Sequence, residues 1–340
     1  MQNKLPAISV IVLAIMAAAW LWLGDSQPPS ADKSLTGQRL LPNLEQQLND
    51  VNRILVEQHG SVYAVVKNGA QWQLPGKGDY PVLFERVKPL LLGIALLEIV
   101  EPKSDKPENH ARLGVQAPAA DSDSMRISLY TEADNPVASL IIGSIRGGLI
   151  TGGKDGIYVR LSGESRAWLV AGNLDLPQQQ LDWVDRQIIQ ITPKKVNRVT
   201  ISHPDGTSLT VGKQRKGAVN FSLMNMPAGS APKNPEEINL LPRGLTALKM
   251  ADVRARPADG PPRSEAVTAT FRTWDGLEVR VTSVEQDDQL WAWFDLLKPG
   301  TSDPGDLQTR FAGWIFQLAP SPASRLRARL SDLDDAELAD

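Results

Sequence analysis

The sequence predicts an α+β protein in which a single N-terminal transmembrane helix is followed by β-rich modules of antiparallel hairpins with packed helices. Three observations predict this class. Residues 5–23 form an apolar run without a charge, alternating apolar residues flank several Asn-Gly and Asp-Gly turns, and a few stretches between these hairpins have apolar residues at helical spacing. The 340 residues exceed one typical domain, and a hydrophobic content of 42% is enough for more than one buried core.

The composition excludes several classes of site. The chain has 36 basic and 39 acidic residues and a net charge of −3, so it has no global field that would attract nucleic acid. It contains no cysteine, which excludes disulfides, thiolate nucleophiles and cysteine-bound zinc or iron–sulfur clusters. We therefore expect no nucleic-acid partner and no cofactor.

The N-terminal run LPAISVIVLAIMAAAWLWL, residues 5–23, has about the length that a helix needs to cross a bilayer core. Lys4 precedes this run and Asp25 follows it, so the positive-inside rule predicts a cytoplasmic N-terminus and an extracytoplasmic remainder. A cleavable signal peptide is the alternative, because the small residues of MAAAW resemble a cleavage site. The run continues past these alanines through Leu23, which favours a retained signal anchor.

The rest of the chain divides by composition and pattern. After the anchor at residues 1–24, a segment with two prolines and small polar residues predicts a linker. The predicted parts are this linker at 25–39, a first α+β module at 40–192, a second β-rich module at 193–325 and an acidic tail at 326–340.

Three predicted hairpins share one form, in which alternating runs flank an Asn-Gly or Asp-Gly turn and resemble a weak internal repeat. They lie at residues 61–74, 199–211 and 267–281, and two further hairpins are predicted at 125–143 and 156–172. Apolar spacing predicts helices at 40–57, at 174–191 and from Val82 to near Pro102, with a kink at Pro89.

The glycine-rich stretch GSIRGGLITGGKDG, residues 143–156, invites comparison with a phosphate-binding loop. Such a loop leads directly into a helix and ends in Lys-Ser or Lys-Thr. Here Lys154 is followed by Asp155 and then by a predicted strand, so we predict a flexible connection between strands.

The stretch VTISHPDGTSLTV places His203 and Asp205 at a turn between two alternating runs. Proline and glycine suit the turn conformation, and the hairpin at 267–281 has the same form with Thr and Trp in place of His and Pro. The histidine is therefore not needed for the pattern. We predict a hairpin corner with both side chains in solvent, in preference to a catalytic pair, because no third group can be identified.

The remaining candidate residues predict no catalytic, cofactor-binding or metal-binding site. His59 and His110 lack the spacing of metal ligands, and the acidic stretches DSDSM and SDLDDAELAD lack the glycine and final glutamate of a calcium loop. The aromatic residues Trp291, Trp293 and Phe294 are the candidate partner or ligand surface. Core packing is the alternative, and the commoner role for side chains with so much apolar area.

Six segments within residues 62–206 occur in a characteristic order: WQLPGKGDYPV, ARLGVQAP, ASLIIG, GIYVRLSGESRAWLV, LDWVDRQIIQI and VNRVTISHPDG. As a set, these segments resemble the bacterial domain-of-unknown-function 4340 family. In that family a Trp-containing strand and Tyr-Pro are followed by a Leu-Gly-x-x-x-Pro element, an Ile-Gly strand, a Tyr-Val strand and a Trp-containing helix. The proline-rich segment at 225–244 departs from the family pattern.

The resemblance implies an extracytoplasmic, membrane-anchored protein of the kind often encoded beside ABC-type transport systems related to the gliding-motility export machinery. It implies no catalytic residue. We therefore expect a non-enzymatic, periplasm-facing accessory or scaffold subunit of such a transport system. Its expected partners are the bacterial inner membrane, through residues 5–23, and ABC transporter permease or ATPase subunits.

Two other functions are compatible with the sequence. An envelope module that binds lipid or cell wall would need an exposed aromatic or apolar groove. An envelope hydrolase would need two carboxylates facing each other across a cleft, for which Asp182, Asp185 and Glu278 are the acids in ordered segments.

Overall fold

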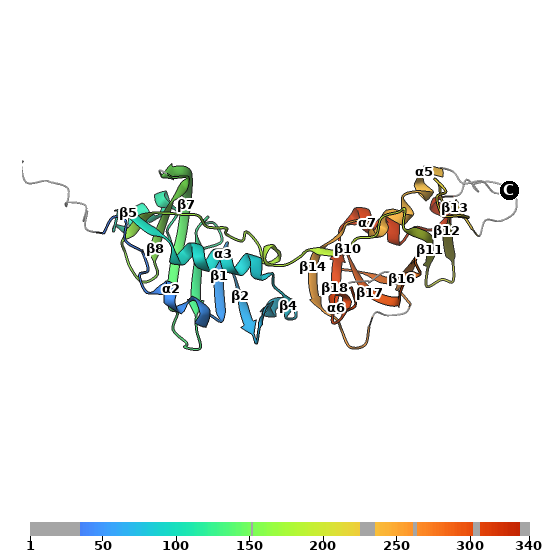
Figure 1. Cartoon of the computed structure of the whole chain (residues 1–340), viewed down its shortest axis with the longest axis horizontal. Coiled ribbons are helices and arrows are strands. Elements are labelled where there is room, and N and C mark those ends of the chain that lie inside the picture. Colours follow the sequence, from blue (N-terminus) through green and yellow to red (C-terminus); the bar gives the residue numbers. More distant parts are fainter. Residues whose placement is uncertain (1–34, 151, 225–234, 261–263, 302–306, 334–340) are drawn as a thin grey trace, which may run out of the picture. The chain divides into compact units, whose positions relative to one another are not determined.

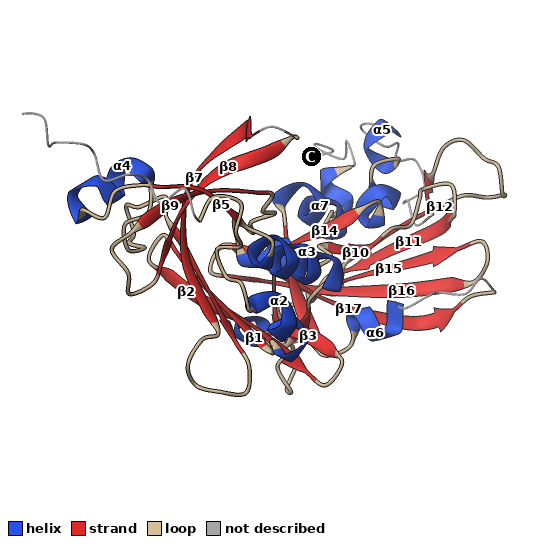
Figure 2. Ribbon diagram, turned by 60° about the vertical axis from the view of Figure 1, so that its left-hand side comes forward, coloured by secondary structure: helices blue, strands red, loops and turns tan. Residues whose placement is uncertain are grey.

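The computed structural model describes residues 35–150, 152–224, 235–260, 264–301 and 307–333. The predicted transmembrane helix at 5–23 lies outside these residues, as does most of the predicted linker. Among the described residues, no helix has both the length and the apolar character needed to cross a membrane. The described chain has two antiparallel sheets of nine strands each. Figure 2 shows that strands predominate over helices.

The chain divides into two compact units. Unit 1 comprises the chain up to Val62 together with Pro89–Asp175, and unit 2 comprises Tyr63–Lys88 together with the chain from Leu176 onward. The predicted module boundary at residue 192 therefore lies within unit 2. The segment Tyr63–Lys88 belongs to unit 2 although it lies early in the sequence.

The first sheet has the strand order β4-β3-β2-β1-β6-β7-β8-β9-β5 (Figure 1). Its strands are β1 Arg53–Gln58, β2 Ser61–Asn68, β3 Gln71–Leu74, β4 Tyr80–Pro81, β5 Glu98–Pro102, β6 Met125–Tyr130, β7 Ala138–Ile150, β8 Lys154–Leu161 and β9 Ala167–Gly172. The helices along this part of the chain are α2 Leu44–Gln47, α3 Phe84–Ala95 and α4 His110–Leu113, with 3₁₀ turns η1 Leu48–Asp50, η2 Pro75–Lys77 and η3 Pro107–Asn109.

The second sheet lies in unit 2 and has the order β10-β14-β18-β17-β16-β15-β11-β12-β13. Its strands are β10 Gln187–Ile189, β11 Val196–Ser202, β12 Ser208–Gly212, β13 Ser222–Leu223, β14 Leu248–Ala255, β15 Val267–Thr273, β16 Leu277–Gln286, β17 Gln289–Pro299 and β18 Trp314–Leu318. The helices are α5 Pro235–Ile238, α6 Leu307–Phe311 and α7 Pro320–Leu326, with 3₁₀ turns η4 Gln180–Trp183, η5 Leu241–Leu245 and η6 Leu330–Asp332.

The predicted hairpins are confirmed. The pairs that close the three Asn-Gly or Asp-Gly hairpins are Asn68↔Gln71, Ser202↔Ser208 and Arg272↔Glu278. The turn residues Gly206 and Gly276 have φ of 86° and 88°, a conformation that glycine adopts without steric cost. The other two predicted hairpins also form, as β6–β7 and β8–β9.

The two helices predicted at 40–57 and 174–191 are wrong. In the first, helical structure ends at Asp50 and β1 follows, because Ile54 and Val56 alternate with less buried neighbours at the period of a strand. In the second, only η4 is helical. The carboxylate of Asp182 accepts hydrogen bonds from the backbone N–H groups of Gln178 and Gln179, and this closes a single turn before β10.

Two other predictions need correction. The glycine-rich stretch at 143–156 is mostly strand, because β7 runs to Ile150 and β8 begins at Lys154, with Ile145 paired to Ile157. The helix with an internal Pro89 is confirmed as α3, but it ends at Ala95 rather than near Pro102. The residues that follow form the edge strand β5.

Residues 36–40 cover the free edge of β5. The N–H of Gly37 donates to the carbonyl of Ile99 at 2.8 Å, and the N–H of Leu40 donates to the carbonyl of Leu97 at 2.9 Å. Hydrogen bonds from Lys154 and Arg39 to the carboxylate of Glu98 hold its pKa below the usual range. An edge that is covered in this way has fewer free backbone groups to pair with another chain.

The core of unit 2 depends on a close approach of η5 and α7 to the second sheet. Phe271 of β15 is fully buried, and Leu326 of α7 is nearly so. A Cβ atom on Gly244 of η5 would lie 3.1 Å from both the Phe271 ring and a methyl group of Leu326. Glycine at this position therefore lets η5 and α7 pack closely over the sheet.

Aromatic contacts hold the segment Tyr63–Lys88 in unit 2. The indole N–H of Trp314 donates to the carbonyl of Gly78 at 3.1 Å, and the ring of Tyr80 meets the ring of Trp314 edge to face at 5.1 Å. The indole N–H of Trp183 donates to the hydroxyl of Tyr63 at 3.1 Å. Burial of this hydroxyl raises the pKa of Tyr63 to about 12.

We expect Phe271→Ala to lower the free energy of unfolding of unit 2 by about 3–5 kcal/mol, because the substitution removes a fully buried ring and leaves a cavity. Urea unfolding followed by tryptophan fluorescence measures this loss. Val219→Ala is the control, since the Val219 side chain is 87% exposed and its truncation should change stability by no more than about 0.5 kcal/mol. Equal midpoints for the two variants would contradict this packing.

We expect the Tyr63 hydroxyl to remain protonated in the folded protein until the pH approaches 12. Its raised pKa contributes stability that is fully present below about pH 10, the ordinary tyrosine value, and is lost as the pH rises through the folded pKa. An ultraviolet titration of phenolate absorbance should show a late phase that Tyr63→Phe removes. If Tyr63→Phe instead removes a titration phase near the ordinary tyrosine pKa of about 10, the Tyr63 hydroxyl is not buried as described.

Candidate functional site

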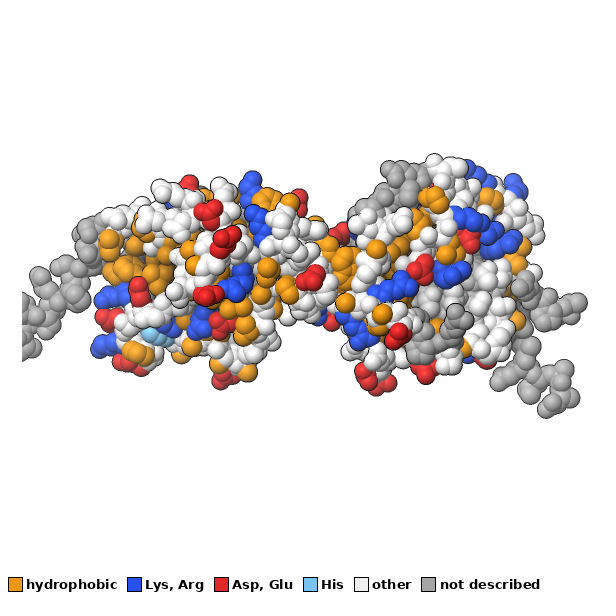
Figure 3. All heavy atoms as spheres, turned by 90° about the horizontal axis from the view of Figure 1, so that it is seen from below, with side chains coloured by type: hydrophobic (Ala, Val, Ile, Leu, Met, Phe, Trp, Pro, Cys, Tyr) orange, Lys and Arg blue, Asp and Glu red, His pale blue; other side chains and the backbone are white. Residues whose placement is uncertain are grey.

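The described part of unit 2 contains an open cleft where β16 and β18 end and β17 and α7 begin. Its volume is about 710 Å³. We call it the α7 cleft. The charged side chains that line it are Glu285, Asp288, Arg327, Arg329 and Asp332. On the face that Figure 3 shows, acidic and basic side chains are interspersed.

Two neighbouring strands form the floor and rim of the α7 cleft. Leu290 and Leu318 pair between β17 and β18, are buried, and supply apolar surface to the lining. The β16–β17 hairpin turns through Asp287 and Asp288, whose φ values of 53° and 57° are those of a two-residue turn with both central residues left-handed. Aspartate tolerates this conformation better than most residues, and the turn brings the Asp288 carboxylate to the rim.

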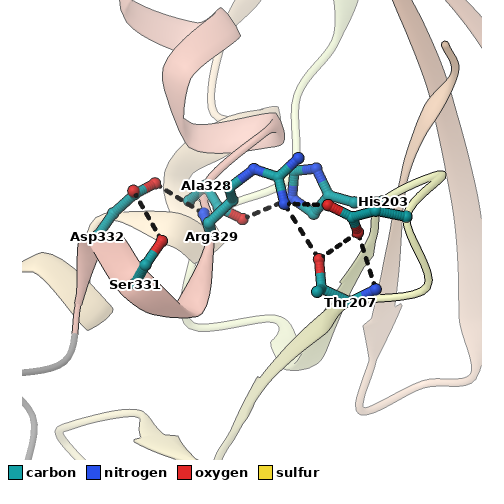
Figure 4. A network of polar contacts seen from close by, with 7 residues as sticks. His203, Thr207, Ala328, Arg329, Ser331 and Asp332 are labelled. Atoms are coloured by element: carbon teal, nitrogen blue, oxygen red, sulfur yellow. Dashed lines mark hydrogen bonds and ion pairs between the residues drawn. The ribbon is translucent and has the colours of Figure 1, made fainter. Parts of the chain in front are cut away.

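The segment after α7 supplies the two arginines. Arg327 donates to the backbone carbonyl of Ser283 at 3.1 Å, and its Nε lies 3.7 Å from the carboxylate of Glu285. The Arg329 side chain reaches the hairpin corner between β11 and β12 (Figure 4). Both guanidinium groups are therefore engaged by the chain itself.

The corner holds Arg329 through a small polar network. The Arg329 guanidinium donates to the Asp205 carboxylate at 2.7 Å and to the Thr207 hydroxyl at 3.1 Å. The hydroxyl and backbone N–H of Thr207 also donate to Asp205, at 2.6 and 2.9 Å. These bonds from Thr207, followed by the bond from Arg329, hold the pKa of Asp205 well below its usual range.

The predicted solvent exposure of His203 is wrong, whereas Asp205 is exposed as predicted. The His203 ring is only 8% exposed, and its Nε2 donates to the carbonyl of Ala328 at 3.2 Å. Its Nδ1 is buried and has no hydrogen-bond partner among the described residues. The ring is buried because the segment after α7 passes close to the corner (Figure 4).

The aromatic candidates Trp291, Trp293 and Phe294 lie in the core of unit 2. Their exposed fractions are 6%, 3% and 1%, so none of the three presents an open surface. The guanidinium of Arg254 lies 4.0 Å above the Trp291 ring, and Phe294 packs edge to face on Phe316. This is the packing role that the sequence left open as the alternative.

The three candidate carboxylates each have their own partners. Asp182 closes the η4 turn, Asp185 lies 2.9 Å from Arg310, and Glu278 lies 3.1 Å from Arg272. Burial raises the pKa of Glu278, but hydrogen bonds from Lys298 and Arg272 outweigh it and leave the pKa below the usual value. A general acid needs a shift in the opposite direction. None of these contacts joins one of the three carboxylates to another.

The other two histidines do not lie in a cluster of ligands. His59 is exposed at the β1–β2 turn with φ of 49°, and the Nε2 of His110 donates to the carbonyl of Ser165 at 2.8 Å. Among the residues that the structure describes, no group of three or more His, Cys, Asp or Glu side chains is placed to hold a metal ion.

Sequence reasoning missed the two arginines of the cleft, because it assigned residues 326–340 to an acidic tail. Up to Leu333 this segment packs on unit 2, with Leu326 and Leu333 buried, and residues 334–340 lie outside the described part. The alternation of apolar Leu326, Leu330 and Leu333 with arginines was the available signal for an ordered segment.

The fold and the cleft define a β-rich α+β protein with two antiparallel sheets, of which the second carries an open polar cleft. The family described as Domain of unknown function (DUF4340) matches residues 72–273, and the chain belongs to this family. The match confirms the resemblance seen in the sequence. It runs from β3 to β15, so it includes the Asp205 corner but not the residues that line the α7 cleft. Neither a curated protein nor a solved structure matches the chain.

We expect Asp205→Asn to lower the melting temperature at neutral pH, because it removes the charge that Arg329 and Thr207 engage. The pKa of Asp205 is lower in the folded protein than in the unfolded chain, which makes the wild type more stable than the variant. This stability advantage is complete above about pH 5. It declines as the pH falls below the ordinary pKa of an aspartate and through the folded pKa. Melting curves of the two proteins from about pH 7 down to about pH 2 measure the difference. Asp134→Asn, at an exposed turn, is the control. A difference that does not shrink with acid would contradict the network.

Proposed function

We propose that this protein is a membrane-anchored accessory or scaffold subunit at the bacterial cell envelope, and that it binds a basic segment of a partner protein in the α7 cleft. The observation that carries the proposal is the charge balance of the cleft. Three carboxylates and two guanidinium groups line it, and Asp205 adds a fourth carboxylate beside Arg329. The balance is therefore negative.

The carboxylates at the rim are the groups available to a partner. The side chain of Glu285 is 70% exposed and meets Arg327 only at 3.7 Å. Asp288 is exposed, and no hydrogen bond or ion pair of the described residues engages it. The two arginines, by contrast, are already held by Ser283 and Asp205. A lysine or arginine of a partner would find the Asp288 carboxylate without a partner among the described residues and the Glu285 carboxylate in a long contact with Arg327. Complementary charge of this kind gives register and specificity.

The form of the cleft also favours a segment of protein chain. It is open to solvent along the rim, and its apolar floor is contributed by Leu290, Leu318, Pro320 and Ala323. A small-molecule site is usually more enclosed and more apolar, with a few convergent polar groups. An extended segment can place apolar side chains on such a floor and basic side chains at the acidic rim.

The proposed location and partners follow from the N-terminal sequence and from the resemblance. Residues 5–23 are proposed to cross the inner membrane once, with the N-terminus in the cytoplasm and both units in the periplasm. The partner is proposed to be a permease or ATPase subunit of an ABC-type transport system. The chain is proposed to act without catalysing a reaction.

The test is purification of the tagged, full-length protein from its native membrane in mild detergent, followed by mass spectrometry of the proteins that co-purify. We compare wild type with Glu285→Lys/Asp288→Lys, which reverses the charge of the rim. Glu132→Lys/Asp134→Lys is the matched control, since it makes the same charge change at an exposed turn of unit 1. We expect wild type and control to recover transporter subunits and the rim variant to lose them.

Two results would contradict the proposal. Equal recovery with the rim variant would show that the α7 cleft does not bind the partner. Recovery of the wild-type protein alone, in a sound preparation, would reject the accessory role and favour an envelope module that binds lipid or cell wall. Deletion of residues 1–24 is a further control, because it removes the proposed anchor and should release the protein from the membrane fraction.

A further inference from the structure

The outward face of α3 carries a row of exposed apolar side chains. Phe84, Leu92 and Leu96 are spaced by multiples of four residues, and their exposed fractions are 56%, 37% and 38%. The backbone N–H of Leu96 bonds the carbonyl of Leu92, so the helical turn continues to this residue. Leu83, which precedes the helix, is also 37% exposed. Residues four apart stack along one side of a helix, so these side chains share a face.

The opposite face of α3 is already packed. Val87, Leu90 and Ile94 are fully buried against the rest of the chain. The fold therefore uses the buried face of α3, and the exposed row of apolar side chains is not part of the core. Ten large hydrophobic residues are exposed in the described part of the chain, and four of them lie between positions 83 and 96. Such a concentration is less common than isolated exposed hydrophobic residues and marks an interaction surface.

One lysine interrupts this row. Lys88 lies between Phe84 and Leu92 at the same spacing of four and is exposed. The same face also carries one carboxylate, that of Glu85. A lysine side chain can lay its aliphatic part along apolar surface and extend its ammonium group to a polar boundary. Apolar side chains with a lysine among them are typical of helices that lie in the interface of a bilayer.

The attachment of the N-terminal segment places this face near the proposed anchor. The Arg39 guanidinium donates to the carbonyl of Leu96 at 2.8 Å, and the N–H of Leu40 donates to the carbonyl of Leu97 at 2.9 Å. Going back towards residues 5–23, the chain passes the C-terminal end of α3 at Arg39 and then runs along β5, where the Thr36 hydroxyl donates to the carbonyl of Val100 at 3.1 Å. The residues between 23 and 36 can span at most roughly 40 Å when extended.

A short tether makes weak contacts effective. A group held within such a distance of a surface meets it at a high effective concentration, so a small apolar patch is enough. A second protein would need more, because stable protein interfaces bury roughly 1,200–2,000 Å² in total and three side chains with a lysine supply only a small part of that. A bilayer next to the tether is therefore the occupant that this face fits.

We propose that the outward face of α3, defined by Phe84, Lys88, Leu92 and Leu96, lies against the surface of the membrane that holds the N-terminal anchor. The three apolar side chains enter the boundary between headgroups and acyl chains, and the Lys88 ammonium group meets lipid phosphates. The proposal rests on the anchor of the proposed function but not on the partner of the α7 cleft.

The test uses the absence of cysteine from the chain. Leu92→Cys and Leu96→Cys each give one site for an environment-sensitive fluorophore in the full-length protein. The labelled proteins are reconstituted into vesicles of phosphatidylethanolamine and phosphatidylglycerol, with or without brominated acyl chains that quench nearby fluorophores. Ile145→Cys is the matched control, because Ile145 is an apolar side chain of unit 1 with a similar exposed fraction, 42%, and lies on β7.

We expect brominated lipid to quench the labels at 92 and 96 and to leave the label at 145 bright. We also expect Lys88→Glu, added to Leu92→Cys, to reduce the quenching in anionic vesicles. Labels at 92 and 96 that are quenched by aqueous iodide and not by brominated lipid, in protein that floats with the vesicles, would overturn this proposal alone. Labels protected from both quenchers, with cysteines that cross-link between copies, would assign the face to a second copy and also overturn it.

The lipid-quenching experiment can fail or succeed independently of the partner-recovery experiment that tests the proposed function. The vesicles contain no transporter subunit, so loss of partner recovery in the native membrane has no bearing on lipid quenching. Protein that does not float with the vesicles would overturn both the anchor and this proposal.

Discussion

The close approach of η5 and α7 to β15 is the constraint on which the arrangement of unit 2 depends. Gly244 has no side chain, so a methyl group of Leu326 and the ring of Phe271 can both pack against its backbone, within 3.1 Å of the place that a Cβ atom would take. The chain then continues past the β11–β12 corner, where Arg329 meets Asp205. Apolar packing is the dominant favourable contribution here, because ion pairs between half-exposed groups add little to stability.

The chemistry of the α7 cleft follows from which charges this packing leaves available. The arginines are the most conspicuous groups in it, but Arg327 and Arg329 are bound by the chain itself. Glu285 contacts Arg327 only at 3.7 Å and Asp288 is exposed, and these two carboxylates are the basis of the proposed preference for a basic segment. The residue types alone would have suggested a site with acidic and basic groups in balance, whereas the contacts leave a surplus of negative charge.

The hairpins were predictable from sequence because their signals are local. The turn at Gly206 combines proline, aspartate and glycine within three positions, and alternating apolar residues on both sides set which face is buried. The wrong helices at 40–57 and 174–191 arose because short apolar stretches fit helix and strand spacing alike. The cleft could not be predicted, since Asp205 and Arg329 are far apart in sequence and only the fold brings them together.

Site-specific photo-cross-linking at the α7 cleft in the native membrane would test the central claim most directly. A photoreactive amino acid at Gln289, an exposed residue of the lining, would be compared with the same amino acid at Asp134. The account predicts an adduct at position 289 to a transporter subunit, through a segment of that subunit rich in lysine or arginine, and no such adduct at position 134. An unmodified chain at 289, or the same adducts from both positions, would contradict it.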